Sequence, residues 1–172
     1  MKQLETERLF LRPFIKDDFI GLYDILKDQR NFKYTDTGKT YTLMETKNFL
    51  QYYLSPQKQE INIAISLKNT NHLIGIIVLK FDTISRAEIS CILNYNYQNN
   101  GYMKEAFQAI IHYAFSIIKI VTLWADTIVD NQHSIKLLES CNFRLFETKK
   151  KHRYLNQNFY DVSYYILNNP FL

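Results

Sequence analysis

The sequence predicts an α+β fold in which helices flank a mixed, largely antiparallel sheet. Three observations predict it. Segments with strand periodicity follow one another between residues 61 and 93, a long amphipathic helix follows at 101–118, and strand-like segments return near the C-terminus. Alternating polarity indicates half-buried strands, whereas apolar residues three and four positions apart indicate a helix. With 172 residues, 47% of them hydrophobic, the chain can form one domain that spans residues 1–172.

The chain begins with a predicted strand and a predicted helix. Residues 8–14 alternate in polarity and end in a Pro-Phe pair, which is typical of a strand that stops there. Asp17 and Asp18 supply capping chemistry for a helix that we expect to reach about Lys27. Its buried stripe is expected to consist of Phe19, Leu22, Tyr23 and Leu26.

A loop and a second helix are expected next. Residues 31–41 are polar and show no clear periodicity, so they should form a loop long enough to shape a substrate mouth. Thr42 and Glu45 have the spacing of a capping box. The helix that they open should run to about Leu54, because the Ser-Pro pair that follows disfavours helical backbone.

The middle of the chain predicts a three-stranded meander. Residues 61–67 alternate in polarity, 73–81 form a buried apolar run after a turn, and 86–93 are rich in strand-forming residues. The helix at 101–118 should pack one face on this sheet, and 121–125 should form a buried strand.

The last quarter predicts a helix and a closing hairpin. Asp130 and Asn131 should begin the helix, which should end near Cys141 and Asn142. The hairpin strands are expected at 143–147 and 159–167. The basic run Lys-Lys-Lys-His-Arg at 149–153 would then lie in the turn between them.

Composition and charge narrow the classes of protein. A formal net charge of +4 lacks the dense cationic stripe of nucleic-acid-binding proteins, so no nucleic-acid partner is expected except through a ribosomal substrate. The two cysteines, Cys91 and Cys141, form no disulfide framework, so a reducing, cytoplasmic setting is expected. The cysteines form no metal motif and the histidines show no ligand spacing, so no metal is expected. Because there is no signal peptide and no stretch of ~20 apolar residues, we expect a soluble protein without a membrane partner.

The run from Asn94 to Ala106 carries the strongest functional signal. It is a polar, turn-forming stretch between a predicted strand and a predicted helix. A helix N-terminus offers partial positive charge and unpaired N–H groups, and Gly101 lets the main chain approach an anion closely. The junction therefore predicts a pyrophosphate site for a nucleotide-type cofactor.

Several motifs carry a family resemblance. Gln98-x-x-Gly101-x-Met103 resembles the Gln/Arg-x-x-Gly-x-Gly/Ala pyrophosphate loop of the GNAT N-acyltransferase superfamily, and the segment from Asn131 to Phe143 resembles its next motif. The opening segment 4–14 and the triplet Ala87-Glu88-Ile89 are similar to the ribosomal-protein alanine/serine N-acetyltransferase branch. The similarities span nearly the whole chain. Met103 departs from the usual Gly or Ala, and Asn142 replaces a usual Gly, a mild change because Asn tolerates the left-handed conformation.

The resemblance implies acetyl-CoA (coenzyme A) as cofactor, held between two parallel strands that splay apart. Main-chain groups would supply most of the contacts, with the diphosphate at the start of the helix. The cofactor-binding residues that it implies are Ile92, Leu93, Asn94, Gln98, Asn99, Asn100, Gly101, Tyr102, Met103, Asn131 and Ser134.

The resemblance also suggests catalytic candidates. Glu88 would act as the base for the acceptor amine, with a structural salt bridge as the alternative role, and Ser134 would donate a proton to the departing thiolate, with a bond back into its own helix as the alternative. Leu138 stands where many relatives have a tyrosine acid. Asp126 either orients the amine or serves as a helix cap or exposed surface residue. We expect Cys91 to be a small buried core residue, which favours direct acetyl transfer over an acyl-cysteine route.

The expected function is transfer of an acetyl group from acetyl-CoA to a primary amine, in the first place a protein N-terminal α-amine, for example of a ribosomal protein. Two alternatives stay open, a small-molecule amine (polyamine, amino acid or antibiotic) and a non-catalytic acyl-CoA-binding module. An open acceptor groove would favour a peptide, whereas a closed acidic pocket near Asp36 and Asp126 would favour a small cation. The basic run 149–153 would be solvated surface or would attract an acidic protein or ribosomal RNA. The sequence leaves the oligomeric state open, a homodimer included.

Overall fold

A computed structural model of the chain describes residues 1–35, 39–155 and 157–170. Its centre is an eight-stranded sheet in the order β1-β2-β3-β4-β5-β6-β8-β7, in which β5 and β6 are parallel and the other neighbours antiparallel. The strands are β1 (Leu4–Glu5), β2 (Leu9–Arg12), β3 (Glu60–Leu67), β4 (Leu73–Phe81), β5 (Arg86–Leu93), β6 (Thr122–Ile128), β7 (Arg144–Leu155) and β8 (Asn158–Asn168). The helices are α1 (Phe19–Leu26), α2 (Leu43–Leu54), α3 (Tyr102–Tyr113) and α4 (Gln132–Ser140).

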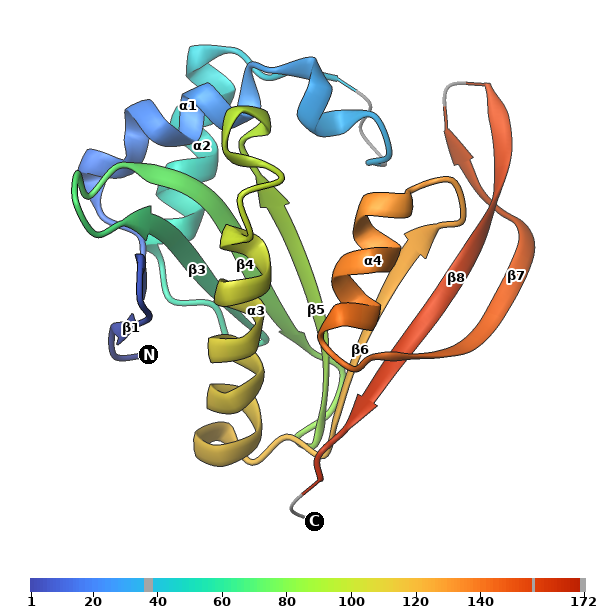
Figure 1. Cartoon of the computed structure of the whole chain (residues 1–172). Coiled ribbons are helices and arrows are strands. Elements are labelled where there is room, and N and C mark those ends of the chain that lie inside the picture. Colours follow the sequence, from blue (N-terminus) through green and yellow to red (C-terminus); the bar gives the residue numbers. More distant parts are fainter. Residues whose placement is uncertain (36–38, 156, 171–172) are drawn as a thin grey trace.

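The helices cover both faces of the sheet, as Figure 1 shows. Alternate strand residues point to opposite faces. Ile63, Ile65 and Ile77 therefore join the core beneath α3 and α4, whereas Ala64 and Ile76 join the core with α1 and α2. The α+β prediction, with a mixed, largely antiparallel sheet and one splayed parallel pair, is confirmed.

Several local predictions are confirmed. Thr42 and Glu45 form both hydrogen bonds of the capping box, and α2 ends at Leu54. The meander has the expected strands. Helix α3 continues as a short π-helical turn to Ile118, close to the predicted end, and Asn142 has the left-handed backbone (φ 66°) that its position after α4 suggested.

The start of α1 differs from the prediction. Asp18 occupies the N-cap position, but its side chain makes no capping bond to α1. Its carboxylate instead accepts two hydrogen bonds from the buried Arg12 guanidinium, both 2.8 Å, and one from the backbone N–H of Ile15. In the helix, Leu22, Leu26 and the unpredicted Ile25 are buried, while Phe19 and Tyr23 are partly exposed.

The closing hairpin is longer than predicted. The basic run Lys149–Arg153 lies in strand β7, so its assignment to a turn is wrong. Lys149 pairs with Val162, and Arg153 pairs with Tyr160. Between these two pairs β7 has two more residues than β8. An irregularity in β7, where Lys151 has positive φ, accommodates the two extra residues. Strand β1 was not predicted, and β6 runs three residues beyond the predicted end, because it continues to pair with β8 as far as Ile128.

Within the described ranges, no helix is both long and apolar enough to cross a membrane.

Gly21 lies in close contact with Leu73 of β4 and gives a stability prediction. A Cβ at this position would meet the Cβ and carbonyl oxygen of Leu73 at 2.6 Å. Alanine normally stabilises a helix relative to glycine, but here the overlap should reverse the sign. We expect Gly21→Ala to lower the free energy of unfolding by about 2 kcal/mol, measured by urea denaturation. Its neighbour Ile20 is exposed, so Ile20→Ala is the matched control and should change stability by no more than about 0.5 kcal/mol. Equal effects of the two substitutions would contradict the prediction.

Candidate functional site

A wedge opens between the two parallel strands. The β5–β6 register covers Arg86 to Glu88 on one strand and Thr122 to Trp124 on the other. Beyond that, β5 continues to Leu93 along β4, and β6 continues to Ile128 along β8. The facing edges therefore diverge, and their peptide groups are directed toward a gap in which a ligand can form hydrogen bonds to the main chain.

A cleft of about 1340 Å³ occupies this wedge and passes between the two helical layers. It exceeds the ~300–1,000 Å³ of a typical small-molecule pocket, which gives room for a long cofactor and a second substrate. Its walls come from residues 29–35, the outer part of β5, the start of α3, the end of β6, α4 and Arg153 of β7.

The loop before α3 has the geometry of an anion site. Gly101 is the N-cap of α3 with left-handed backbone (φ 78°), and Gln98 donates from Nε2 to the Leu93 carbonyl at 3.1 Å, which ties the loop to the end of β5. Among the predicted cofactor residues, the cleft is lined by Ile92, Leu93, Gln98, Asn99, Gly101, Tyr102, Met103, Asn131 and Ser134.

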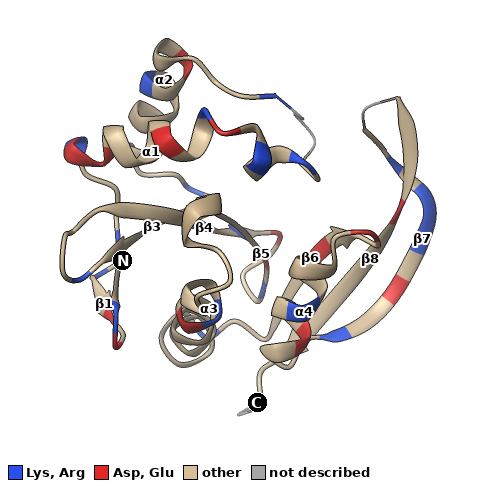
Figure 2. Cartoon of the chain, turned by 45° about the horizontal axis from the view of Figure 1, so that its top comes forward, with Lys and Arg blue, Asp and Glu red and all other residues tan. Residues whose placement is uncertain are grey.

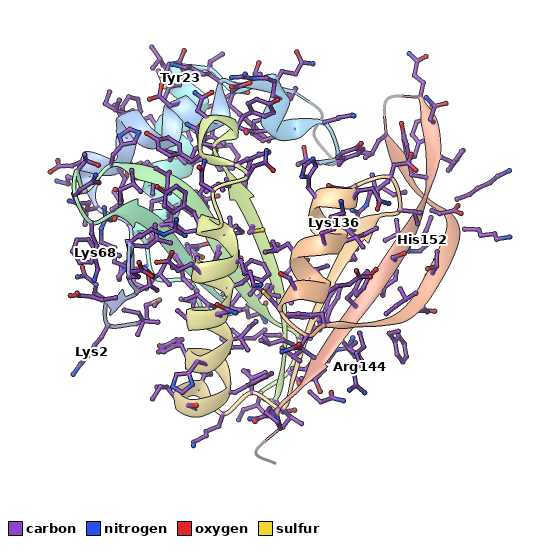
Figure 3. All side chains as sticks on the ribbon, viewed as in Figure 1. Lys2, Tyr23, Lys68, Lys136, Arg144 and His152 are labelled. Carbon is purple, nitrogen blue, oxygen red and sulfur yellow. The ribbon has the colours of Figure 1, made fainter. Side chains whose placement is uncertain are left out.

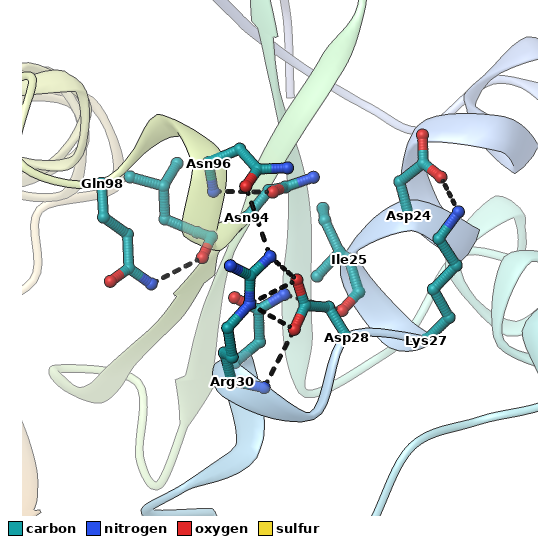
Figure 4. Close-up of polar contacts among 10 residues, drawn as sticks. Asp24, Ile25, Lys27, Asp28, Arg30, Asn94, Asn96 and Gln98 are labelled. Carbon is teal, nitrogen blue, oxygen red and sulfur yellow. Dashed lines mark hydrogen bonds and ion pairs between the residues drawn. The ribbon is translucent and has the colours of Figure 1, made fainter.

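Asn94 and Asn100 use their side chains within the loop. Asn94 is buried, and its side-chain oxygen accepts the N–H of Asn96, as Figure 4 shows. The Asn100 side chain turns back into its own loop and donates to the Gln98 carbonyl at 2.9 Å. Neither residue belongs to the cleft wall, because each side chain stabilises the turn that shapes the loop.

Met103 lies at the start of α3, mostly turned into the core. Its side chain is only 8% exposed and packs in the core under α3. The backbone of the first turn of α3 therefore remains directed at the cleft. A left-handed glycine, a helix N-terminus and an open strand edge together fit the diphosphate and pantetheine of coenzyme A.

The start of α4 forms the opposite wall. Asn131 is its N-cap, and its side-chain oxygen accepts the Ser134 N–H at 3.3 Å, so the capping role is confirmed, while its amide N–H₂ group remains a donor. Ser134 is partly buried at the cleft. Among the described residues, no protein group forms a hydrogen bond with its hydroxyl. The alternative role, in which the hydroxyl bonds back into α4, is therefore not seen. Leu138 is buried.

Two carboxylates lie on the face of the wedge toward α1 and α2. Glu88 and Asp126 come from β5 and β6, and Asp126 accepts a hydrogen bond from the Arg153 guanidinium at 2.8 Å. Within the described part of the chain Glu88 has no ion pair, so its alternative role in a salt bridge is not seen. Burial and, next, the negative charge of Asp126 raise the pKa of Glu88. A carboxylate with a raised pKa is a stronger base than an exposed glutamate.

Cys91 does not have the buried core position that was predicted. Its side chain is exposed at the cleft wall. The surrounding protein nevertheless removes enough water to raise the pKa of the thiol to about 12. It is therefore protonated at neutral pH and a poor nucleophile, which favours direct transfer.

The mouth of the cleft contains residues that sequence reasoning missed. Arg30 pairs with Asp28, bonds the Asn96 side chain at 3.3 Å and lies 4.1 Å from the centre of the Tyr95 ring, so it joins the mouth to the segment before α3 (Figure 4). Lys33, Tyr34 and Arg153 also line the cleft, whereas Asp36 lies outside the described residues. The contacts of Arg30 with Tyr95 and Asn96 join segments far apart in sequence, and no local pattern predicts them.

Charges of both signs surround the cleft. Figure 2 shows basic residues on β7, on the mouth segment and on the helices, and Figure 3 shows Lys136 on α4, which is one of the cleft-lining residues. Lys104 on α3 lines the same cleft. A lysine from each of the two helices thus raises the local potential for an anionic ligand.

Comparisons with known proteins agree with this geometry. Residues 8–144 match the family model for the Acetyltransferase (GNAT) domain. The uncharacterized N-acetyltransferase YnaD of Bacillus subtilis is 28% identical over 165 residues, which cover 95% of each chain. The crystal structure of a GNAT-family acetyltransferase from Bacillus anthracis has a TM-score of 0.89 and 27% identity and covers 98% of this chain and 99% of its own.

Two further solved structures are similar in fold. RimL, a ribosomal-protein α-N-acetyltransferase in complex with coenzyme A, has a TM-score of 0.85 and 23% identity and covers 97% of this chain and 98% of its own. Spermidine N-acetyltransferase from Vibrio cholerae, in complex with CoA and spermine, has a TM-score of 0.82 and 17% identity and covers 94% of this chain and 95% of its own.

Proposed function

The chain belongs to the GNAT acetyltransferase family and is an acetyl-CoA-dependent N-acetyltransferase, and from this premise we propose that its acceptor is a protein N-terminal α-amine. The observation that supports this acceptor best is the open, charge-balanced cleft on the Glu88 side of the wedge.

Acetyl-CoA would supply a thioester-activated acetyl group when it is bound. The N–H groups at the start of α3, around Gly101, would hold its diphosphate. The open edge of β5 at Ile92 and Leu93 would pair with the pantetheine, and the amide of Asn131 would steer it from the other side. The acetyl group would then lie in the wedge, with the acceptor approaching from the face that carries Glu88.

Glu88 would accept the proton that the amine must lose. Deprotonating a lysine-like amine at pH 7 costs roughly 4 to 5 kcal/mol, whereas an α-amine costs about 1 kcal/mol. A single half-buried carboxylate is sufficient to deprotonate an α-amine. Because the pKa of Glu88 is raised, its basicity is better matched to an α-amine than that of an exposed glutamate.

Ser134 would act at the leaving group. Its hydroxyl has no bond to the protein within the described residues and faces the cleft opposite β5. It can donate a hydrogen bond to the thiolate as that charge develops. With Leu138 in place of a tyrosine, no other side chain of α4 is proposed for this role.

The charge balance separates the two acceptor classes. A polyamine carries several positive charges and calls for a net acidic pocket. Here Asp126 is neutralised by Arg153, Asp28 by Arg30, and Lys33 lies beside Tyr34 at the mouth. The similarity in fold to RimL agrees with a protein acceptor. A small amine is the second candidate, because the fold is also similar to that of the spermidine enzyme and the carboxylates Glu88 and Asp130 line the cleft.

The decisive experiment is an acceptor screen. Purified protein and acetyl-CoA would be incubated with peptides that have a free N-terminus, with the same peptides blocked at the N-terminus but carrying a lysine, and with spermidine and free amino acids. Mass spectrometry and thiol release would report transfer. We expect acetylation of free N-termini and none of the blocked peptides. Transfer to spermidine in preference to every peptide would overturn the protein acceptor in favour of the second candidate.

The setting follows from the same residues. Both cysteines in the described structure are free, and we propose a reducing, cytoplasmic location where ribosomal proteins would be available as acceptors. A homodimer also belongs to the proposal, and light scattering of the purified chain would test it.

A further inference from the structure

We propose that Arg8 is a positioning residue for the cofactor: it balances the charge of Glu105 in the first turn of α3 and holds the Asn100–Tyr102 loop in the form that receives a diphosphate. The inference rests on the proposed function only in that coenzyme A binds in the cleft. Arg8 itself is not part of the cleft wall. It acts from behind the loop, and it is therefore not a catalytic residue.

Three groups from the N-terminal segment converge on Glu105. The Arg8 Nε atom lies 2.7 Å from Oε2, the Arg8 backbone N–H donates to Oε1 at 2.8 Å, and the Thr6 hydroxyl donates to the same oxygen at 2.5 Å. The Glu105 side chain is 16% exposed. The carboxylate is thus held at a fixed position beside the N-terminus of α3.

The same guanidinium also contacts the loop. Its Nη1 donates to the Asn100 carbonyl at 2.9 Å, and its centre lies 4.4 Å from the centre of the Tyr102 ring. Its Nη2 would be 3.4 Å from a Cβ at Gly101. Three successive residues at the start of α3 therefore lie against one side chain, which restrains the backbone there.

The electrostatics explain why such a contact is needed. Burial acts to raise the pKa of Glu105, but the hydrogen bonds from Thr6 and Arg8 outweigh it, so the pKa is lowered and the group is ionised at neutral pH. A negative charge in the first turn stabilises a free helix, yet at this helix it lies next to the place where a diphosphate must bind. Arg8 offsets that charge and leaves the N-terminus favourable for an anion.

Calorimetric titration with coenzyme A tests the proposal through a double-mutant cycle. Arg8→Gln exposes the Glu105 charge and removes the bond to Asn100, and we expect the Kd to rise about tenfold. Glu105→Gln leaves the positive charge of Arg8 uncompensated and should bind coenzyme A at least as tightly as the unsubstituted protein. The double variant should recover part of the loss, to about threefold above the starting Kd. Kinetics should show a higher KM for acetyl-CoA with an unchanged kcat.

The controls distinguish a specific role of Arg8 from a general charge effect, a misfolded variant and a protein that does not bind coenzyme A. Arg144→Gln removes an exposed cation on β7 and should leave the Kd unchanged. If Arg8→Gln does not fold, Arg8→Lys keeps the charge, loses the bond to Asn100, and should raise the Kd about threefold. An unchanged Kd in a folded Arg8 variant, or no recovery in the double variant, would overturn the role of Arg8. Failure of the unsubstituted protein to bind coenzyme A would instead reject the proposed function.

Discussion

Gly101→Asp should abolish measurable binding of coenzyme A. Gly101 is the N-cap of α3, and its backbone N–H belongs to the group that would hold the diphosphate. Two unit charges 4 Å apart near a protein surface interact by about 4 kcal/mol, and each 1.4 kcal/mol is a factor of ten, so the Kd should rise at least about 100-fold. Pairing of the new carboxylate with Arg8 would not restore binding, because it would draw the guanidinium from Glu105 and leave the loop one charge more negative.

Gly101→Asn is the matched control for this charge effect. Asparagine has the shape of aspartate without its charge, and both tolerate the left-handed backbone that Gly101 has, with φ of 78°. The asparagine variant should therefore lose only a small part of the affinity. Calorimetry of both variants separates charge from shape, and equal affinities would show that no diphosphate lies at this helix.

Glu88→Gln should lower kcat/KM for the acceptor about 100-fold at pH 7 while leaving the affinity for coenzyme A unchanged. The amide keeps the size of the side chain but cannot accept the amine proton. The loss should shrink as the pH rises, because a larger fraction of the amine is then already neutral. Glu88 lies on the face of β5 that we propose for the acceptor, away from the proposed diphosphate loop, so binding and transfer should separate. Full activity of the glutamine variant would remove Glu88 from the proposed chemistry.

The pH profile gives a second readout of the same residue. A base must be deprotonated to act, so the rate should fall as the pH drops through the pKa of Glu88. Burial and the charge of Asp126 raise that pKa, and the acid limb should therefore lie above that expected for an exposed glutamate. In Glu88→Gln this limb should be lost, whereas Asp126, which is paired with Arg153, stays present in both proteins.

The sequence predicted the parts of the fold that depend on local patterns. The capping box at Thr42 is closed by residues three positions apart, and the meander strands carry alternation along their own length. The candidate phosphate loop was also proposed from local chemistry, since a glycine between a strand and a helix lets an anion approach the N–H groups of the helix N-terminus. The splayed strands came from family resemblance, because no side-chain pattern announces a missing hydrogen bond between strands.

The parts that were missed depend on contacts between distant segments. Arg8 and Glu105 are 97 positions apart, and neither differs locally from an ordinary surface charge. Arg153 bonds Asp126 across the sheet, and it can do so because β7 extends to Leu155, which places the basic run in a strand and not in the expected turn. The prediction that Cys91 is buried was wrong for a related reason. A residue between apolar neighbours is predicted to lie in the core unless it is known that the neighbouring strand, here β6, diverges from it.

The two ends of the sheet have a consequence for self-association. At one end β1 has two residues, too short to template another strand, and at the other β7 is long but carries Lys149, Lys150 and Lys151. Sheet growth through β7 would bring these ammonium groups against those of an incoming copy, and such lysines are a common protection of open strand edges. Both margins of the sheet therefore disfavour the addition of a strand from a second molecule.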